Sequence, residues 1–159
     1  MTIRTAIVTC SDRCSKGEAE DTSGPELQML VQERGWYVVD YRVVPDEREQ
    51  IADIMVELAD ELRVDLILTT GGTGLGPRDV TPEATFDVSD RDVPGIAEHI
   101  RAESMKVTGR AMLSRAVSTM RGSTLIVNLP GSLKAVREAF GFFADQVEHA
   151  VEMAAGGGH

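Results

Sequence analysis

The sequence of 159 residues predicts an α/β protein with a mostly parallel β-sheet that helices cover on both faces. Short apolar runs alternate with segments of ten or more residues at helical spacing, which is typical of right-handed βαβ units. The runs are almost continuously apolar, as expected for strands buried on both faces of a sheet. Hydrophobic residues make up 42% of the chain and charged residues 26%, which suits a single folded domain.

Four apolar runs predict the strands of the sheet. They cover residues 3–9, 36–44, 64–70 and 123–129. Each run is followed closely by polar residues, a proline or a glycine, which end a strand. Because ligands of parallel α/β proteins bind at the carboxyl ends of the strands, we expect the loops after these runs to line one pocket.

Helices are predicted between and after these strands. Ser23 and Asp46 each precede a glutamate at capping-box spacing, and Thr81 precedes a proline and an acidic residue. The predicted helices begin at Ser23, Asp46, Thr81, Pro94 and Ser132, and the last is expected to be one long helix. The secondary structure of residues 110–121 is ambiguous in the sequence, because the segment has apolar residues but no clear helix caps. Residues 1–155 are expected to form the domain, and residues 156–159 a flexible tail.

Charge and composition exclude several classes of partner. The chain has 16 Lys and Arg against 26 Asp and Glu, a net charge of −10, which argues against nucleic acids and anionic membranes. The first apolar run is too short for a signal peptide or a spanning helix, so a cytoplasmic protein is expected. Cys10 and Cys14 are too few for a structural zinc site, and free thiols are favoured over a redox pair.

A glycine-rich loop follows the third predicted strand, with the sequence GGTGLGPRD over residues 71–79. Successive backbone N–H groups in such a loop can approach an anion closely, and the hydroxyls of Thr70 and Thr73 lie beside them. A phosphate or pyrophosphate site is therefore one interpretation. The alternative is a tight turn that needs glycine only for its positive φ. The spacing departs from the dinucleotide-binding fingerprint, and the loop has no P-loop lysine.

Two carboxylates and several polar side chains near the strand ends are candidates for ligand contacts. Asp46 and Asp79 could share a Mg²⁺ ion with substrate phosphates, although Asp46 is also explained as a helix N-cap. Neutral hydrogen-bonding groups are available on Ser11, Ser114, Asn128 and Ser132. Candidates for pairing with phosphate, each with the alternative of a solvated surface charge, are Arg78, Arg110 and Arg115.

Five ordered motifs along nearly the whole chain resemble the molybdopterin adenylyltransferase family, which includes bacterial Mog and MoaB proteins and the G domain of gephyrin. The motifs are SDR (11–13), VPDE (44–47), TTGGTGLGPRDVTPEAT (69–85), LSRAV (113–117) and NLPGS (128–132). The resemblance implies a three-layer α/β/α molybdopterin-binding domain. It further implies a cytoplasmic homotrimer, with a hexamer as the alternative.

The resemblance also implies an activity in molybdenum cofactor biosynthesis. Proteins of this family adenylylate molybdopterin with Mg-ATP, which gives adenylyl-molybdopterin and pyrophosphate, and the product is handed to a molybdenum-insertion protein. Asp46 and Asp79 would be the catalytic and Mg²⁺-binding carboxylates. Substrate or nucleotide binding would fall to Ser11, Asp12, Arg13, Thr70, Gly71, Gly72, Thr73, Gly74, Thr81, Glu83, Ser114, Arg115, Asn128, Pro130, Gly131 and Ser132.

Two alternatives to the enzyme remain. After the NLPGS motif the chain passes directly into its last helix, the shorter layout of MoaB-like members. Some MoaB proteins lack the two aspartates and are not competent for transfer, so one alternative is a molybdopterin-binding paralogue without transferase activity. The retained Asp46 and Asp79 favour the enzyme. The other alternative is a nucleotide-binding module that acts on a different substrate.

Overall fold

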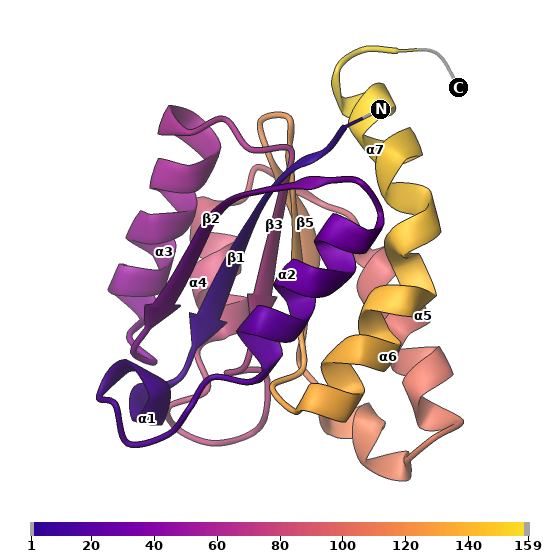
Figure 1. Ribbon diagram of the computed structural model, residues 1–159. Helices are drawn as coiled ribbons and strands as arrows, with labels where there is room; N and C mark the ends of the chain where they lie inside the picture. The colour runs from indigo at the N-terminus through magenta and orange to yellow at the C-terminus, as the bar shows by residue number, and fades with distance from the viewer. Residues whose placement is uncertain (1, 158–159) are drawn as a thin grey trace.

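A six-stranded sheet with the order β2-β1-β3-β6-β5-β4 forms the centre of the computed structural model, which describes residues 2–157 (Figure 1). The strands are β1 (Arg4–Cys10), β2 (Tyr37–Val44), β3 (Leu66–Thr70), β4 (Arg91–Asp92), β5 (Ser118–Arg121) and β6 (Thr124–Leu129). The four predicted strands correspond to β1, β2, β3 and β6, which pair in parallel. Strands β4 and β5 were not predicted and extend the sheet in antiparallel pairing.

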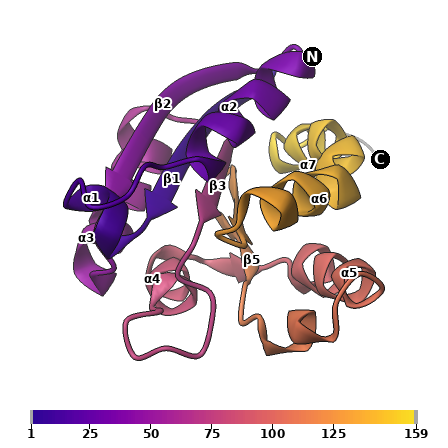
Figure 2. The same ribbon diagram turned by 60° about the horizontal axis from the view of Figure 1, so that its bottom comes forward.

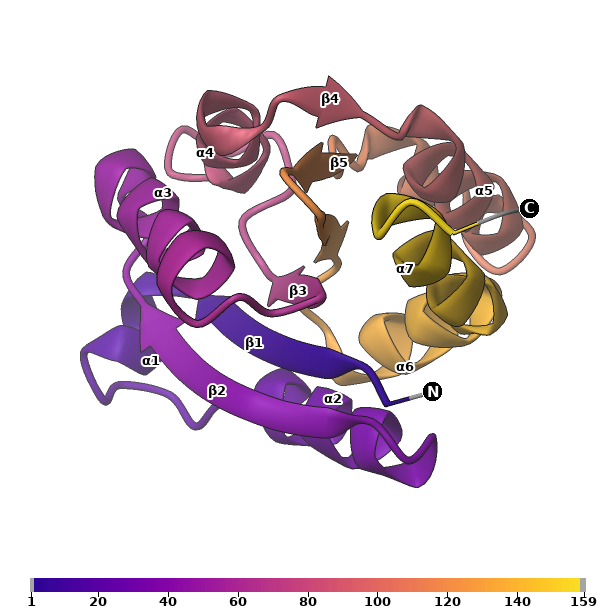
Figure 3. The same cartoon turned by 90° about the horizontal axis from the view of Figure 1, so that it is seen from above.

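Helices cover both faces of this sheet, as Figure 3 shows from above. They are α1 (Asp12–Ser15), α2 (Ser23–Glu33), α3 (Arg48–Val56), α4 (Thr81–Val88), α5 (Pro94–Met105), α6 (Leu133–Phe143) and α7 (Val147–Ala154). Helices α3 and α4 lie on one face, and α2, α5, α6 and α7 lie on the other. The predicted three-layer α/β/α architecture is therefore confirmed.

The pleat of the central strands divides their side chains between two apolar cores. In β1, Ile7 packs in the cluster with α2 and α6, whereas Ala6 and Val8 pack in the cluster with α3 and α4. In β3, Leu66 and Ile67 separate in the same way. These side chains are fully buried. Burial on both faces explains why the strands are almost continuously apolar in sequence.

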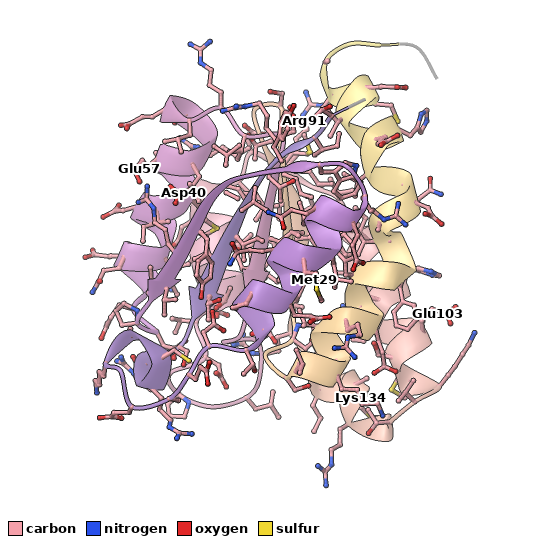
Figure 4. All side chains as sticks on the ribbon, viewed as in Figure 1. Met29, Asp40, Glu57, Arg91, Glu103 and Lys134 are labelled. Carbon is pink, nitrogen blue, oxygen red and sulfur yellow. The ribbon has the colours of Figure 1, made fainter. Side chains whose placement is uncertain are left out.

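Strand β2 forms one edge of the sheet and carries charges there. Arg42 of β2 pairs with Asp40 of the same strand at 2.8 Å and with Glu57, which directly follows α3. Figure 4 shows Asp40 and Glu57 close together at this edge. Charged side chains on an edge strand oppose its pairing with a strand of another molecule.

The structure confirms one prediction for the last part of the chain and contradicts another. Ser132 caps α6 as predicted, because its hydroxyl accepts a hydrogen bond from Ala135 N at 3.3 Å. The prediction of a single long final helix is wrong, because a 3₁₀ turn over Ala144–Gln146 separates α6 from α7. Gly157 N bonds back to the end of α7 at 2.9 Å. Residues 158–159 of the predicted tail lie outside the described residues.

Unlike Ser132, three residues that were predicted as helix N-caps do not cap a helix. Ser23 is already the first residue of α2, and Asp21 accepts the hydrogen bond from Gly24 N at 3.1 Å instead. Thr81 is likewise the first residue of α4 and caps nothing. Asp46 lies two residues before α3 begins, and its carboxylate accepts a hydrogen bond from the N–H of Asp12, the first residue of α1.

The helices of the described residues are short or amphipathic. None of them combines the length and the apolar character that crossing a bilayer needs.

Shortening a central side chain should destabilise the protein strongly. Ile67 is fully buried between β1 and β6, so Ile67→Ala should cost about 2–5 kcal/mol of unfolding free energy through lost burial and a residual cavity. Met153→Ala is the control because Met153 is 44% exposed, and it should cost less than about 0.5 kcal/mol. Urea unfolding at one protein concentration measures both, and equal costs would contradict the burial pattern.

Candidate functional site

The carboxyl ends of β1, β2, β3 and β6 lie at one edge of the molecule, which Figure 2 turns toward the viewer. Four segments follow these strand ends and contact one another. They are residues 11–15, 45–47, 71–80 and 130–132. The glycine-rich loop after β3 runs between α1 and the turn that follows α5 (Figure 2). This edge holds most of the residues that the sequence indicated as a site.

The first two glycines of the loop are required by their surroundings. Gly71 has φ 94°, and a Cβ there would lie 2.5 Å from the carbonyl oxygen of Cys10. Gly72 has φ 69°, and a Cβ there would lie 2.3 Å from Thr81 Oγ1. Both positions combine left-handed backbone with a close approach to a neighbouring segment, so any other residue would displace the loop.

Thr81 and Arg115 hold the loop in place. The Thr81 hydroxyl donates to Gly71 O at 3.0 Å. The Arg115 guanidinium donates to Gly74 O at 2.8 Å and to Asp79 O at 2.6 Å. These bonds connect the first helix residue of α4 and the segment before β5 to both ends of the loop, and Thr81 therefore supports the loop backbone directly.

Glu83 completes the contacts of Arg115. The two side chains form an ion pair at 2.6 Å, and this hydrogen bond from Arg115 lowers the pKa of the Glu83 carboxyl. Both residues were predicted to contact substrate. In the structure their charged groups bond to the protein itself.

Backbone donors remain available in the middle of the loop. Within residues 2–157, the N–H groups of Gly72, Thr73 and Gly74 donate to no protein acceptor. Consecutive free N–H groups in a turn can bind an anion, because each carries a partial positive charge. The turn interpretation and the phosphate interpretation of the glycines are thus compatible.

Asp46 stands beside this row of N–H groups. Its Oδ2 accepts a hydrogen bond from Asp12 N at 3.0 Å. Its Oδ1 is buried without a hydrogen-bond partner in the described part of the chain, and a Cβ on Gly72 would be 3.1 Å from it. Burial raises the pKa of the Asp46 carboxyl, and the charges of Asp12 and Asp79 raise it further. A cation beside Oδ1 would favour the ionised form.

Asp79 has a local structural role that the sequence did not reveal. Its Oδ2 accepts a hydrogen bond from Gly76 N at 2.9 Å and so closes the second half of the loop. Among residues 2–157 no group of three or more His, Cys, Asp or Glu side chains could hold a metal ion. Asp46 and Asp79 would therefore provide only part of a coordination shell, which fits Mg²⁺ bound together with phosphates and water.

Two cavities flank the loop. The larger, of about 500 Å³, lies between the loop, α5, the 3₁₀ turn Gly109–Leu113 and β6, and its lining is mainly apolar. The predicted site residues that line it are Thr73, Gly74, Arg110, Ser114, Asn128 and Pro130. The smaller, of about 190 Å³, lies between the ends of β1 and β3 and the start of α2. The predicted residues that line it are Ser11, Thr70, Gly71 and Gly131.

Several of these side chains already have hydrogen bonds within the protein. Asn128 is 1% exposed, and its amide donates to Thr69 Oγ1 and Thr85 Oγ1 at 3.0 Å each. The Ser11 hydroxyl caps α1, as the Ser132 hydroxyl caps α6. Predicted site residues that line neither cavity are Asp12, Arg13, Asp46, Gly72, Arg78, Asp79, Thr81, Glu83, Arg115 and Ser132.

Sequence reasoning missed two residues at the cavities. Arg101 of α5 lines the larger cavity and donates to Ser114 O at 3.0 Å and Ala116 O at 3.2 Å. Asp21 lines the smaller cavity and accepts hydrogen bonds from Thr9 and Tyr41. An aspartate just before a helix start was a usable signal for Asp21. Arg101 had none, because it lies within a predicted helix far from any strand end.

The chain belongs to a family described as a probable molybdopterin binding domain, whose model matches residues 6–149. The chain is 38% identical over 160 residues to the molybdopterin adenylyltransferase of Helicobacter pylori strain J99, with 98% of this chain and 89% of the relative covered. The resemblance to this family is therefore confirmed.

Solved structures agree with this assignment. The molybdopterin biosynthesis enzyme MoaB from Thermus thermophilus superposes with a TM-score of 0.92 at 42% identity, covering 98% of each chain. The molybdopterin biosynthesis Mog protein from Mycobacterium ulcerans superposes with a TM-score of 0.90 at 36% identity, covering 98% of this chain and 99% of the other.

The two thiols should differ in reactivity. Cys10 is 2% exposed, and burial raises the pKa of its thiol to about 12, so the buried thiol stays protonated and unreactive at pH 8. Cys14 is only partly buried. A chromogenic disulfide reagent should therefore modify one thiol per native chain and two after denaturation. Two thiols reacting at the same rate in the native protein would contradict the burial of Cys10.

Proposed function

We propose that this protein is a molybdopterin adenylyltransferase of molybdenum cofactor biosynthesis. In the proposed reaction an oxygen of the terminal phosphate of molybdopterin attacks the α-phosphorus of ATP. A new phosphoanhydride bond forms, the bond between the α- and β-phosphates breaks, and pyrophosphate leaves. No covalent protein nucleophile is needed for this transfer, so the protein acts by alignment and by compensation of charge.

One observation carries the proposal. The buried Oδ1 of Asp46 has no partner in the described part of the chain and lies against Gly72, next to the free N–H groups of the loop. A buried carboxylate oxygen without a partner is costly in a protein that only has to fold. A ligand that brings both a cation and phosphates would satisfy Oδ1 and the N–H groups together.

The cavities and the loop suggest which part of the site each chemical group of the substrates occupies. The N–H groups of Gly72, Thr73 and Gly74 are proposed to bind phosphate. The larger, mainly apolar cavity, with Ser114 at its border, suits a heteroaromatic group. Ser11, Thr70 and Gly131 at the smaller cavity, and Ser132 near it, are proposed to contact the other parts of the substrates, while Arg13 lies exposed at the same edge.

Asp46 and Asp79 are proposed to hold Mg²⁺. When bound, Mg²⁺ would compensate the charge of the ATP triphosphate and of the leaving pyrophosphate. Residues 71–79 would orient the phosphates through backbone donors. Arg115, Glu83 and Thr81 would keep the loop rigid through their hydrogen bonds. Asn128 would hold β3 and α4 together beside the loop.

A molybdopterin-binding paralogue without transferase activity is the second candidate. The shorter layout after the NLPGS motif, in which Ser132 leads directly into α6, is the feature that favours it. Asp46 and Asp79 favour the enzyme, because a protein that only binds molybdopterin does not need carboxylates placed for a cation. Residues 1–155 are proposed to be the functional domain, in a cytoplasmic protein whose product passes to a molybdenum-insertion protein.

Replacing Asp46 should separate transfer from binding. Asp46→Asn keeps the shape but puts an amide in place of one carboxylate oxygen, so adenylylation should fall by ~10²–10³. Molybdopterin affinity should change less than about threefold, because the carboxylate is assigned to the nucleotide and metal. Pyrophosphate release and direct pterin binding would be measured on one preparation, with circular dichroism as a check of folding.

The matched control for Asp46→Asn is Asp87→Asn. Asp87 pairs with Arg48 on the surface between α3 and α4, at 2.7 Å. This variant should retain full transfer. Transfer by Asp46→Asn within threefold of the parent protein would refute the role of Asp46, and loss of pterin binding would move Asp46 to the pterin site.

The protein is proposed to be a homotrimer, with a hexamer as the alternative. Large apolar side chains outside the cavities, among them Phe86 at 50% and Met112 at 62%, remain at least half exposed on the single chain, and assembly could cover them. Light scattering at micromolar concentration should give three times the 17.2 kDa of one chain. A stable monomer mass would contradict the trimer.

A further inference from the structure

Asp12 and Asp46 are joined by a reciprocal pair of hydrogen bonds. Asp46 N donates to Asp12 Oδ1 at 2.9 Å, and Asp12 N donates to Asp46 Oδ2 at 3.0 Å. The pair links the end of β1 to the end of β2, 34 residues apart in sequence. Because Oδ2 of Asp46 is held in this way, its Oδ1 is directed toward Gly72.

Arg78 secures Asp12 from the glycine-rich loop. Its Nε donates to Asp12 Oδ2 and its terminal nitrogen to Asp12 Oδ1, each at 3.1 Å. The same terminal nitrogen donates to Glu47 Oε1 at 2.8 Å. One guanidinium therefore connects the loop after β3 with the segments after β1 and β2.

These contacts engage both carboxylate oxygens of Asp12 within the protein. Both of its carboxylate oxygens accept bonds from Arg78, and Oδ1 also accepts from Asp46 N. Arg78 is the cation between Asp12 and Glu47, so it compensates these carboxylates and leaves Oδ1 of Asp46 without a partner in the described residues. The arrangement keeps one carboxylate oxygen free and the neighbouring carboxylates bonded.

We propose that Arg78 and Asp12 are positioning residues that act through Asp46. They fix Oδ1 of Asp46 beside the backbone donors of the loop, and neither contacts a substrate. This inference rests on the proposed function, and it gives Asp12 and Arg78 a different role from the substrate and phosphate contacts that the sequence suggested.

Geometry, and not charge alone, is the critical property of Arg78 in this proposal. A planar guanidinium can bond to both oxygens of Asp12 and to Glu47, whereas a lysine ammonium offers one charge without this fork. Arg78→Lys should therefore lose almost as much transfer as Arg78→Gln, about 10–100-fold in kcat. The KM for molybdopterin should change less than about threefold in both variants.

A double variant tests whether Arg78 acts through Asp12. Asp12→Ala should lower kcat to a similar degree, and Asp12→Ala with Arg78→Gln should be no worse than Asp12→Ala within about threefold. Losses that multiply would overturn the proposal, since Arg78 would then act independently. A raised KM for Mg-ATP with unchanged kcat in Arg78→Gln would also overturn it, because that pattern indicates direct phosphate binding.

The matched control for these variants is Arg48→Gln. Arg48 forms a bidentate pair with Asp87 at 2.7 Å for both bonds, and its side chain is 54% exposed, compared with 55% for Arg78. It belongs to α3, and its partner belongs to α4. Arg48→Gln should leave kcat and both KM values within about twofold of the parent protein.

Binding of Mn²⁺ with ATP provides a readout that needs no turnover. Electron paramagnetic resonance of free Mn²⁺ would be followed while protein and ATP are added. Asp12→Ala and Arg78→Lys should bind the Mn²⁺–ATP probe about tenfold more weakly than the parent protein. Parent-like binding by both variants would overturn the positioning role.

The two measurements separate failure of this inference from failure of the proposed function. A parent protein that binds Mn²⁺–ATP but forms no pyrophosphate would refute the transferase, while weaker Mn²⁺–ATP binding by Asp12→Ala would still support positioning. A parent protein that transfers normally, with Arg78→Lys equally active, would refute positioning and leave the transferase intact. A parent protein that does not bind Mn²⁺–ATP would overturn the positioning inference.

Discussion

The close approach of Gly71 to the ends of two neighbouring strands determines the shape of the site. Gly71 N donates to Leu129 O of β6 at 3.1 Å. On its other side Gly71 is so close to β1 that a side chain at this position would collide with Cys10 O. The loop can leave β3 in this direction only with left-handed backbone at residues 71 and 72. That turn places the next N–H groups beside Asp46 and opens a cavity on each side of the loop.

Polar groups at this edge divide into those that build the site and those left for a ligand. Arg115, in the segment before β5, connects the loop to α4, and Asn128 connects β6 to β3 and α4. Oδ1 of Asp46 and the N–H groups of Gly72, Thr73 and Gly74 have no hydrogen-bond partner within the described residues. Buried polar groups normally have hydrogen-bond partners within the protein. A carboxylate oxygen and N–H groups that lack such partners and lie close together therefore indicate a binding site.

Local sequence patterns predicted the parallel part of the sheet well. Strands buried on both faces need continuous apolar runs, and the glycines after residues 64–70 marked the loop. Strands β4 and β5 have two and four residues, too short for a recognisable period. The cap assigned to Asp46 was wrong because its partner, Asp12, is distant in sequence. Local spacing also could not show that Arg78 and Arg115 bond to the protein.

Isotope-labelled ATP tests the proposed chemistry most directly. The protein would be incubated with molybdopterin, Mg²⁺ and ATP that carries label either at the α-phosphate or at the γ-phosphate. Attack at the α-phosphorus predicts that α-label appears on the pterin and γ-label in pyrophosphate, in equal amounts. Molybdopterin that binds tightly to the protein but acquires no α-label would contradict the assignment of the strand-end site as a transferase.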